Sequence, residues 1–268
     1  MTRPAPTVTH PAPGWTVRRS GPLAWLVVDR PAKHNAVSLQ MWRDLPGVLQ
    51  PLAADPDLRV LLVEGEGATF CAGADIGDLV AGEQPDPMAP LRAANLAALA
   101  ALRAFPRPTV AVVRGAAIGG GLEIATACDL RVADRSARFG VTPAKIGVVY
   151  HPPSIRALRD LVGPAAAAYL LFSGRLLDAE QAHLRGLVDV LAADADAEAV
   201  ALAQEMCARS ALTQQAAKDV LRALSEGADP EAGIEERYLE TIASGELPEG
   251  VAAFLERRAP AFPWRPHA

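Results

Sequence analysis

The sequence lacks the features that would place it among secreted or membrane proteins. Its three cysteines (Cys71, Cys128 and Cys207) are odd in number and far apart, which favours reduced thiols over a disulfide framework. The first residues contain no apolar stretch typical of a signal peptide, and no run approaches the roughly 18 apolar residues of a membrane span. We therefore expect a cytoplasmic protein without a membrane segment.

Clusters of charge and of metal ligands are also missing. Lysine and arginine residues are scattered and the formal net charge is -5, which gives no electrostatic footprint for nucleic acid. His34 and His183 have no histidine, cysteine or acid at metal-ligand spacing, and no Gly-x-Ser-x-Gly motif occurs. The sequence predicts neither a nucleic-acid partner, nor a metal site, nor a serine hydrolase.

What the sequence does contain is enough apolar material for one sizeable core, since 50% of its 268 residues are hydrophobic and 21% are charged. Residues 1–14 include four prolines, which disfavour helix and sheet pairing, so we predict a flexible tail outside the fold. Residues 15–191 are predicted to form the folded core. Residues 192–268 are predicted to be helical, either as a lid on that core or as a contact with a neighbouring subunit.

The predicted core belongs to the α/β class. Residues 15–19 and 23–28 read as a strand pair, and Ser38 reads as the N-cap of a helix reaching residue 54. Residues 58–63 read as a strand buried on both faces, followed by a glycine loop. The succession returns as a helix from about residue 90 to 104, a strand at 109–113, a glycine cluster and a helix from about residue 120, which predicts a right-handed spiral. Later helices are predicted at 153–172 and 178–185, with a strand at 187–191.

Two loops carry the candidate chemistry, Phe70–Ile76 (FCAGADI) and Gly115–Glu123 (GAAIGGGLE). Each follows a buried strand, contains small residues and opens a helix. Small side chains let a ligand touch the backbone, and unsatisfied N–H groups that converge on one point can form an oxyanion hole. One glycine cluster alone favours a tight turn, whereas two such loops in one chain favour a binding site.

Together these loops resemble the signature loops of the crotonase (enoyl-CoA hydratase/isomerase) superfamily. The resemblance covers nearly all of the chain after the tail, from Arg30–Ala36 (RPAKHNA), similar to the family's early CoA-contacting loop, to Phe254–Phe262 (FLERRAPAF). It implies a ββα spiral core at 15–191 that binds an acyl-CoA thioester, and a C-terminal region at 192–268 for oligomerisation and pocket closure. It further implies a homotrimer or homohexamer and no metal or redox cofactor.

Carried onto this sequence, the resemblance places the thioester carbonyl oxygen between the backbone N–H groups of Ala74 and Gly120. Charge develops on this oxygen when a proton or a carboxylate leaves the α-carbon, and one preorganised donor is typically worth about 3 to 4 kcal/mol of barrier. Asp75 can contact the ligand directly, and it can equally serve only as the N-cap of its short helix. The substrate-binding residues implied by the resemblance are Ala36, Ala72, Ala74, Asp75, Ile76 and Gly120.

Glu123 is the predicted acid or base. It follows the triple glycine by two residues, so it lies in the first turn of the next helix, near the predicted oxyanion site. Partial burial would raise its pKa towards a value useful for proton transfer. Taken alone, it is a first-turn glutamate favoured by the helix dipole. The match to one of the two glutamates of family hydratases favours catalysis.

The sequence departs from the family pattern at Pro143, which occupies the position of the second hydratase glutamate. Proline cannot handle a proton, so ordinary hydration and simple Δ3,Δ2-enoyl-CoA isomerisation are both disfavoured. Tyr150 aligns with a tyrosine near the active site of methylmalonyl-CoA decarboxylase relatives, and a phenol can orient a substrate carboxylate. His151 can act as an acid or base. Both residues also fit purely structural roles.

Three functions remain open from the sequence. The first is acyl-CoA chemistry of the hydratase or isomerase type, the second is decarboxylation of a malonyl-type thioester, and the third is acyl-CoA binding with little catalysis. A dinucleotide site at Gly115–Gly121 is disfavoured, because the loop lies mid-chain and no tyrosine is followed four residues later by lysine.

Overall fold

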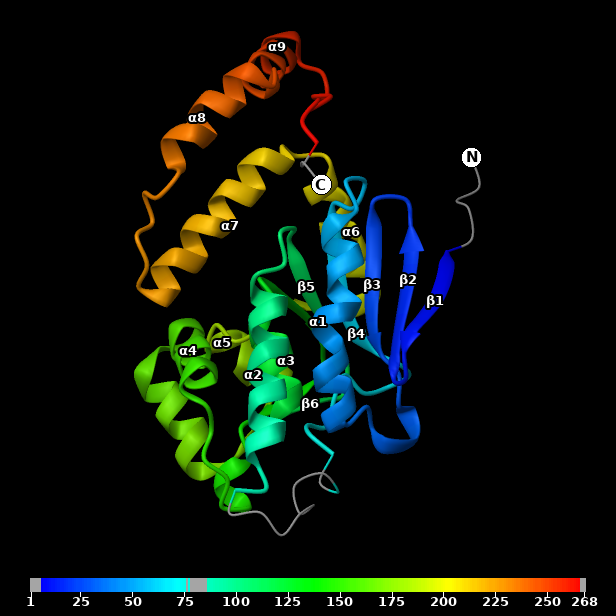
Figure 1. Ribbon diagram of the computed structural model, residues 1–268, viewed down its shortest axis with the longest axis vertical. Helices are drawn as coiled ribbons and strands as arrows, with labels where there is room; N and C mark the ends of the chain where they lie inside the picture. Colours follow the sequence, from blue (N-terminus) through cyan, green and yellow to red (C-terminus); the bar gives the residue numbers. More distant parts are fainter. Residues whose placement is uncertain (1–5, 76, 78–85, 266–268) are drawn as a thin grey trace.

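The computed structural model describes residues 6–75, 77 and 86–265, and its main feature is a seven-stranded sheet in the order β1-β2-β3-β4-β5-β7-β10 (Figure 1). From β3 to β10 neighbouring strands run parallel, whereas β1 and β2 extend one edge in antiparallel fashion. A second sheet has the order β6-β8-β9. The strands are β1 (Thr7–Ala12), β2 (Trp15–Ser20), β3 (Leu23–Val28), β4 (Val60–Gly65), β5 (Thr109–Val113), β6 (Ala116–Ile118), β7 (Leu130–Asp134), β8 (Arg138–Gly140), β9 (Leu176–Asp178) and β10 (Val190–Ala192).

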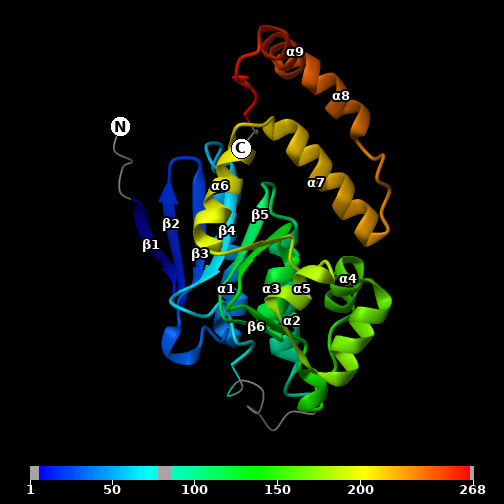
Figure 2. The same ribbon diagram turned by 180° about the vertical axis from the view of Figure 1, so that it is seen from behind.

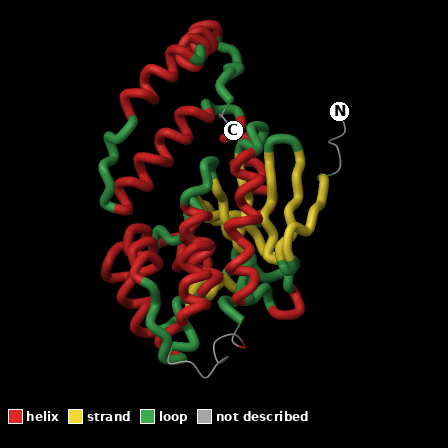
Figure 3. The backbone as a smooth tube through the Cα atoms, viewed as in Figure 1, coloured by secondary structure: helices red, strands yellow, loops and turns green. Residues whose placement is uncertain are grey.

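Helices cover both faces of the large sheet, which confirms the predicted α/β class (Figure 3). The helices are α1 (Leu39–Ala54), α2 (Ala89–Arg103), α3 (Gly120–Ala127), α4 (Pro152–Ser173), α5 (Ala179–Leu184), α6 (Ala195–Cys207), α7 (Ala211–Glu226), α8 (Ile234–Ala243) and α9 (Glu246–Glu256). The start of α1 is as predicted, since the Ser38 hydroxyl accepts a hydrogen bond from the Met41 amide.

Strand β4 shows how the core divides. Its residues are all buried and their side chains alternate between the two faces. Leu61 and Val63 join the cluster beneath α1 and α2, and Leu62 joins the cluster beneath α6. Figure 2 shows α6 on the face opposite to α1. Residues 192–268 therefore include one helix that packs on the sheet as well as helices that extend away from it.

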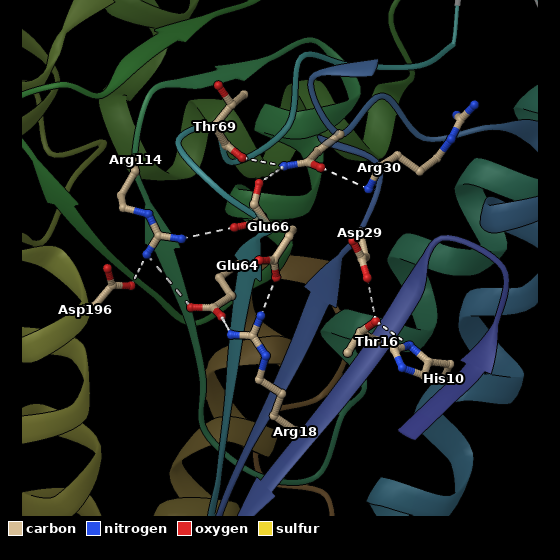
Figure 4. Close-up of polar contacts among 12 residues, drawn as sticks. His10, Thr16, Arg18, Asp29, Arg30, Glu64, Glu66, Thr69, Arg114 and Asp196 are labelled. Atoms are coloured by element: carbon tan, nitrogen blue, oxygen red, sulfur yellow. Dashed lines mark hydrogen bonds and ion pairs between the residues drawn. The ribbon is translucent and has the colours of Figure 1, made fainter. Parts of the chain in front are cut away.

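The prediction of a flexible tail over residues 1–14 is wrong for Thr7–Ala12. This segment is strand β1, which pairs with β2 through a register shift between Thr9 and Ala12. Proline cannot donate a ladder hydrogen bond, but an edge strand with a bulge tolerates it because one side has no partner. The His10 ring and the Thr16 hydroxyl are also 2.9 Å apart, as drawn in Figure 4.

A charged network joins the carboxyl ends of β4 and β5 to α6 (Figure 4). Arg18 pairs with Glu64 at 2.8 Å and also with Glu66, and Arg114 pairs with Asp196 at the start of α6. Burial raises the pKa of the Glu64 carboxyl, and Arg114 and Arg18 oppose that shift. The network fixes the strand ends from which both candidate loops depart.

The C-terminal helices α7, α8 and α9 extend beyond the sheet (Figure 1). The chain end turns back, so that Trp264 packs on Ala211 and Leu212 at the start of α7. Large apolar side chains on these helices are exposed: Leu221, Leu224, Tyr238, Leu239, Ile242, Leu247, Val251, Phe254 and Leu255. In the part of the chain that the structure describes, no helix has the length and apolar character needed to cross a membrane.

Candidate active site

The two glycine-containing loops lie side by side. The Cys71 amide donates to the Ala116 carbonyl at 2.8 Å, and the Ile118 amide donates to the Cys71 carbonyl at 3.1 Å. A third loop joins them, because the Val37 amide donates to the Gly73 carbonyl at 2.8 Å. Segments far apart in the sequence thus form one backbone layer at the carboxyl ends of β4 and β5.

The glycines of the second loop permit a close approach to the first. A Cβ atom added to Gly121 would lie 2.1 Å from the Cys71 carbonyl oxygen, so any larger residue would push the loops apart. A Cβ atom on Gly120 would lie 3.2 Å from the Ala74 amide nitrogen and 3.1 Å from Cζ2 of Trp42. The backbone of Gly120 and the amide of Ala74 therefore meet at one place, beside the Trp42 indole.

The amides of Ala74 and Gly120 lie at a cavity of about 610 Å³, and both residues line it. Among the described residues, neither amide donates a hydrogen bond to a protein acceptor. Gly120 is also the first residue of α3, where the helix dipole favours negative charge. This arrangement can bind an oxygen atom that carries or develops negative charge.

Glu123 lines the same cavity and is only 5% exposed. The Asn95 side-chain amide donates to Glu123 Oε2 at 3.0 Å, while Oε1 has no hydrogen-bond partner within the described residues. Burial raises the pKa of the Glu123 carboxyl, and Ser154 and Asn95 oppose the shift. The Ser154 hydroxyl has no hydrogen bond of good geometry in that part of the chain, so we attribute the opposing effect mainly to Asn95. Such a carboxyl is suited to proton transfer.

Tyr150 and His151 line the same cavity. The Tyr150 hydroxyl donates to the Gly119 carbonyl at 3.2 Å. Burial raises the pKa of this hydroxyl well above its ordinary value, and the Glu123 carboxylate adds to the effect, so Tyr150 remains an uncharged donor. Burial lowers the pKa of the His151 imidazole and the charge of Arg92 lowers it further, which keeps the ring neutral at pH 7.

Pro143 also lines the cavity, at the start of a short 3-10 turn over Pro143–Lys145. Its ring suits the first position of such a turn, where the missing N–H is no loss. No carboxylate stands at this position of the wall. Among the described residues that line the cavity, Glu123 is the one buried carboxylate. Pro143 lines the same cavity.

The predicted substrate-binding residues divide into two groups. Ala72, Ala74 and Gly120 line the cavity, whereas Ala36 and Asp75 do not. Arg30 links Ala36 to Asp75, because its guanidinium donates to the Ala36 carbonyl at 2.7 Å and to Asp75 Oδ2 at 3.1 Å. The Gly77 amide also donates to Asp75 Oδ1, and this bond together with Arg30 holds the pKa of Asp75 below its usual value. Ile76 lies outside the described residues.

Several residues that line the cavity are missing from the sequence-based set, and three of them are α-helical residues with polar side-chain atoms. They are Trp42 on α1 and Arg92 and Asn95 on α2. Across the described chain, Trp42 Nε1 and Asn95 Oδ1 are buried without a hydrogen-bond partner. Asn95 had a detectable signal, since it interrupts the buried apolar stripe of α2 formed by Leu91, Ala94, Ala98, Leu99 and Leu102. Within the described residues there is no group of three or more histidine, cysteine, aspartate or glutamate residues that could hold a metal ion.

Known proteins resemble this chain along almost its whole length. The family model described as enoyl-CoA hydratase/isomerase matches residues 18–265. The 2,3-dehydroadipyl-CoA hydratase of Escherichia coli is 35% identical over 253 residues, covering 93% of this chain and 98% of the relative.

Two solved structures show the same similarity in three dimensions. An enoyl-CoA hydratase/carnithine racemase from Magnetospirillum magneticum has a TM-score of 0.87 and 33% identity, covering 95% of this chain and 96% of its own. An enoyl-CoA hydratase from Mycobacterium smegmatis has a TM-score of 0.85 and 28% identity, covering 94% and 99%. The crotonase-like fold expected from the two loops is confirmed by these similarities.

Proposed function

Since the chain belongs to the enoyl-CoA hydratase/isomerase family, we propose that it binds an acyl-CoA thioester and stabilises the enolate formed from it. The observation that carries the proposal is the pair of amides at Ala74 and Gly120, which have no protein acceptor among the described residues and face a cavity shared with the buried Glu123. An enolate oxygen would accept both N–H groups, and the N-terminus of α3 would favour its charge.

Glu123 is the proposed acid or base. Its Oε2 is held by Asn95, which fixes the carboxyl while Oε1 stays without a protein partner in the described part of the chain. In this proposal Glu123 transfers a proton to or from the carbon next to the thioester, and its raised pKa suits both directions. Backbone donors and one carboxyl account for this step, so we propose a reaction without a metal or redox cofactor.

Decarboxylation of a malonyl-type thioester is the second candidate, and Tyr150 favours it. When the carbon–carbon bond to the carboxylate breaks, carbon dioxide leaves and the electron pair enters the enolate, which is then protonated on carbon. When its single O–H turns from the Gly119 carbonyl to the departing carboxylate, the neutral phenol of Tyr150 can orient that group without repelling it. Pro143 supports this candidate too, because hydration in well-known family members uses a second glutamate there.

The experiment is a parallel incubation with crotonyl-CoA and methylmalonyl-CoA, followed by mass spectrometry of both thioesters. Gain of water by crotonyl-CoA supports hydratase chemistry, and loss of carbon dioxide from methylmalonyl-CoA supports decarboxylation. In either case Glu123→Gln is expected to lower turnover by about 10²- to 10⁴-fold, the usual contribution of a general acid or base, while acyl-CoA affinity is retained.

If both thioesters bind and neither changes, acyl-CoA binding is supported, and hydration and decarboxylation of these two thioesters are excluded. If neither thioester binds, the enolate proposal is wrong.

We also propose that the protein is a homotrimer or homohexamer assembled through its C-terminal helices. The exposed apolar side chains of α7, α8 and α9 support this, because contiguous apolar surface usually marks an interface. The three free cysteines, of which Cys71 and Cys128 are buried, fit a reducing cytoplasmic compartment.

A further inference from the structure

Cationic side chains share the cavity with the groups discussed above. The cations are Arg92 and Lys145, and they line it together with the neutral ring of His151, the carboxylate of Asp86 and apolar residues such as Leu91 and Val149. A simple hydrocarbon acyl chain needs only an apolar wall, and placing charged groups beside it costs desolvation without a compensating contact. The cations therefore indicate that the ligand brings an anionic group into this part of the cavity.

Arg92 is placed to meet the acyl part of the ligand. It precedes Asn95 by three residues on α2, and Asn95 donates to Glu123. Three residues of α-helix rise about 4.5 Å, so the two positions lie on neighbouring turns of one helix face. His151 is near enough for the charge of Arg92 to act on it, and its ring has no hydrogen-bond partner in the described part of the chain.

The present partner of Arg92 can be replaced at little cost. Its guanidinium pairs with Asp86, and the two side chains are 42% and 50% exposed. Exposed ion pairs contribute little to stability because water and salt screen them. Arginine also has five N–H donors, so it can bind a ligand carboxylate in bidentate fashion while keeping or releasing Asp86.

We propose that the acyl group of the substrate carries a carboxylate at the end remote from the thioester, and that Arg92 binds this carboxylate with His151 beside it. The inference rests on the proposed acyl-CoA function and names the substrate class of the same site. The coenzyme A phosphates are the other source of negative charge that Arg92 could meet, so the test separates the two.

The test compares three ligands by isothermal titration calorimetry: adipoyl-CoA, hexanoyl-CoA and free coenzyme A. The two acyl groups match in length and are saturated, so neither can be hydrated or decarboxylated. We expect adipoyl-CoA to bind at least tenfold more tightly than hexanoyl-CoA. Arg92→Gln should remove this preference and leave the affinities for hexanoyl-CoA and coenzyme A within twofold of the original values.

Two further variants test whether Arg92 itself recognises the ligand carboxylate. Asp86→Asn removes the competitor of the ligand carboxylate, so it should raise the affinity for adipoyl-CoA and leave that for hexanoyl-CoA unchanged. Arg135→Gln is the control for loss of one positive charge, since Arg135 is 74% exposed, does not line the cavity and pairs with Glu180. It should alter none of the affinities.

Two outcomes overturn the inference. Equal affinity of the original protein for adipoyl-CoA and hexanoyl-CoA would show that no remote carboxylate is recognised. An equal loss for all three ligands in Arg92→Gln would assign Arg92 to the coenzyme A phosphates. If no ligand binds at all, the proposed acyl-CoA function fails first, and that result is distinct from both.

Discussion

The cavity buries polar atoms that lack hydrogen-bond partners, whereas the C-terminal helices expose apolar side chains that lack a covering surface. Around the cavity, polar atoms of Trp42, Asn95 and Glu123 are buried without a hydrogen-bond partner among the described residues. On α8 and α9, large apolar side chains face outward, with Leu239 68% exposed and Phe254 83% exposed. Each condition is unfavourable for an isolated chain, because buried polar atoms need partners and apolar surface favours burial.

The cavity and the C-terminal helices therefore indicate different kinds of partner. A cavity with unpartnered donors and acceptors fits a small molecule with matching polar groups, such as a thioester. An exposed apolar helix face fits another protein surface. The two regions also differ in what a substitution should affect, since one should change turnover and the other should change assembly.

Of the three substitutions that test this comparison, Gly120→Ala on the cavity side has the largest expected effect. The added Cβ would lie 3.2 Å from the Ala74 amide nitrogen, where the proposed oxyanion binds, so turnover should fall by about 10²- to 10³-fold. Steady-state kinetics with the substrate found above would measure it, alongside the melting temperature. Gly47→Ala is the control, since its Cβ would meet no atom within 4 Å, and it should keep full activity. Unchanged turnover in Gly120→Ala would exclude these amides as the oxyanion site.

The next effect is on the helix side. Phe254→Glu places a charge on the exposed face of α9, so we expect the assembly to dissociate at least tenfold more readily while the α/β core keeps its circular dichroism spectrum. Light scattering coupled to size-exclusion chromatography measures the change. Glu256→Gln, on the same helix and 61% exposed, should leave assembly unaltered. A monomeric original protein at all concentrations would contradict the idea that this face is an interface.

The smallest effect concerns stability and pH. Burial raises the pKa of Glu123 in the folded state above its ordinary value of 4.5. The folded chain therefore binds more protons than the unfolded chain between these two values, and its stability falls as pH rises through them. Glu123→Gln should raise the melting temperature by a few degrees at neutral pH, with the gain vanishing below about pH 4.5. Calorimetry from pH 4 to 8 would show this, and a gain independent of pH would refute the explanation.

Local sequence signals predicted the elements of the fold well where period and capping agreed. The Ser38 cap, the strand pair at residues 15–28 and the buried strand at 109–113 lie as expected. The prediction of a flexible tail is wrong for Thr7–Ala12, because its prolines disfavour a central strand and the sequence does not reveal that this strand lies at an edge. The strand expected at 187–191 is found at Val190–Ala192, while Leu187 and Val188 are buried outside it.

The candidate site was predictable only where backbone chemistry defines it. The glycines of the two loops show in the sequence, and the resemblance named Ala74, Gly120 and Glu123. Trp42 and Arg92 could not be found in this way, because a residue on an amphipathic helix shows its direction only after helices pack against each other. Specificity therefore depends on tertiary positions that a single sequence does not display.

The use of main-chain donors also has an evolutionary consequence. A substitution at Ala74 changes its side chain and keeps its N–H group, so these donors are inherited with the fold. The carboxyl of Glu123 in the cavity wall belongs to a side chain and can be exchanged by a single mutation. Under the proposed function, a lineage with this architecture can change its reaction in small steps, because exchange of a proton-transferring side chain leaves these backbone donors in place.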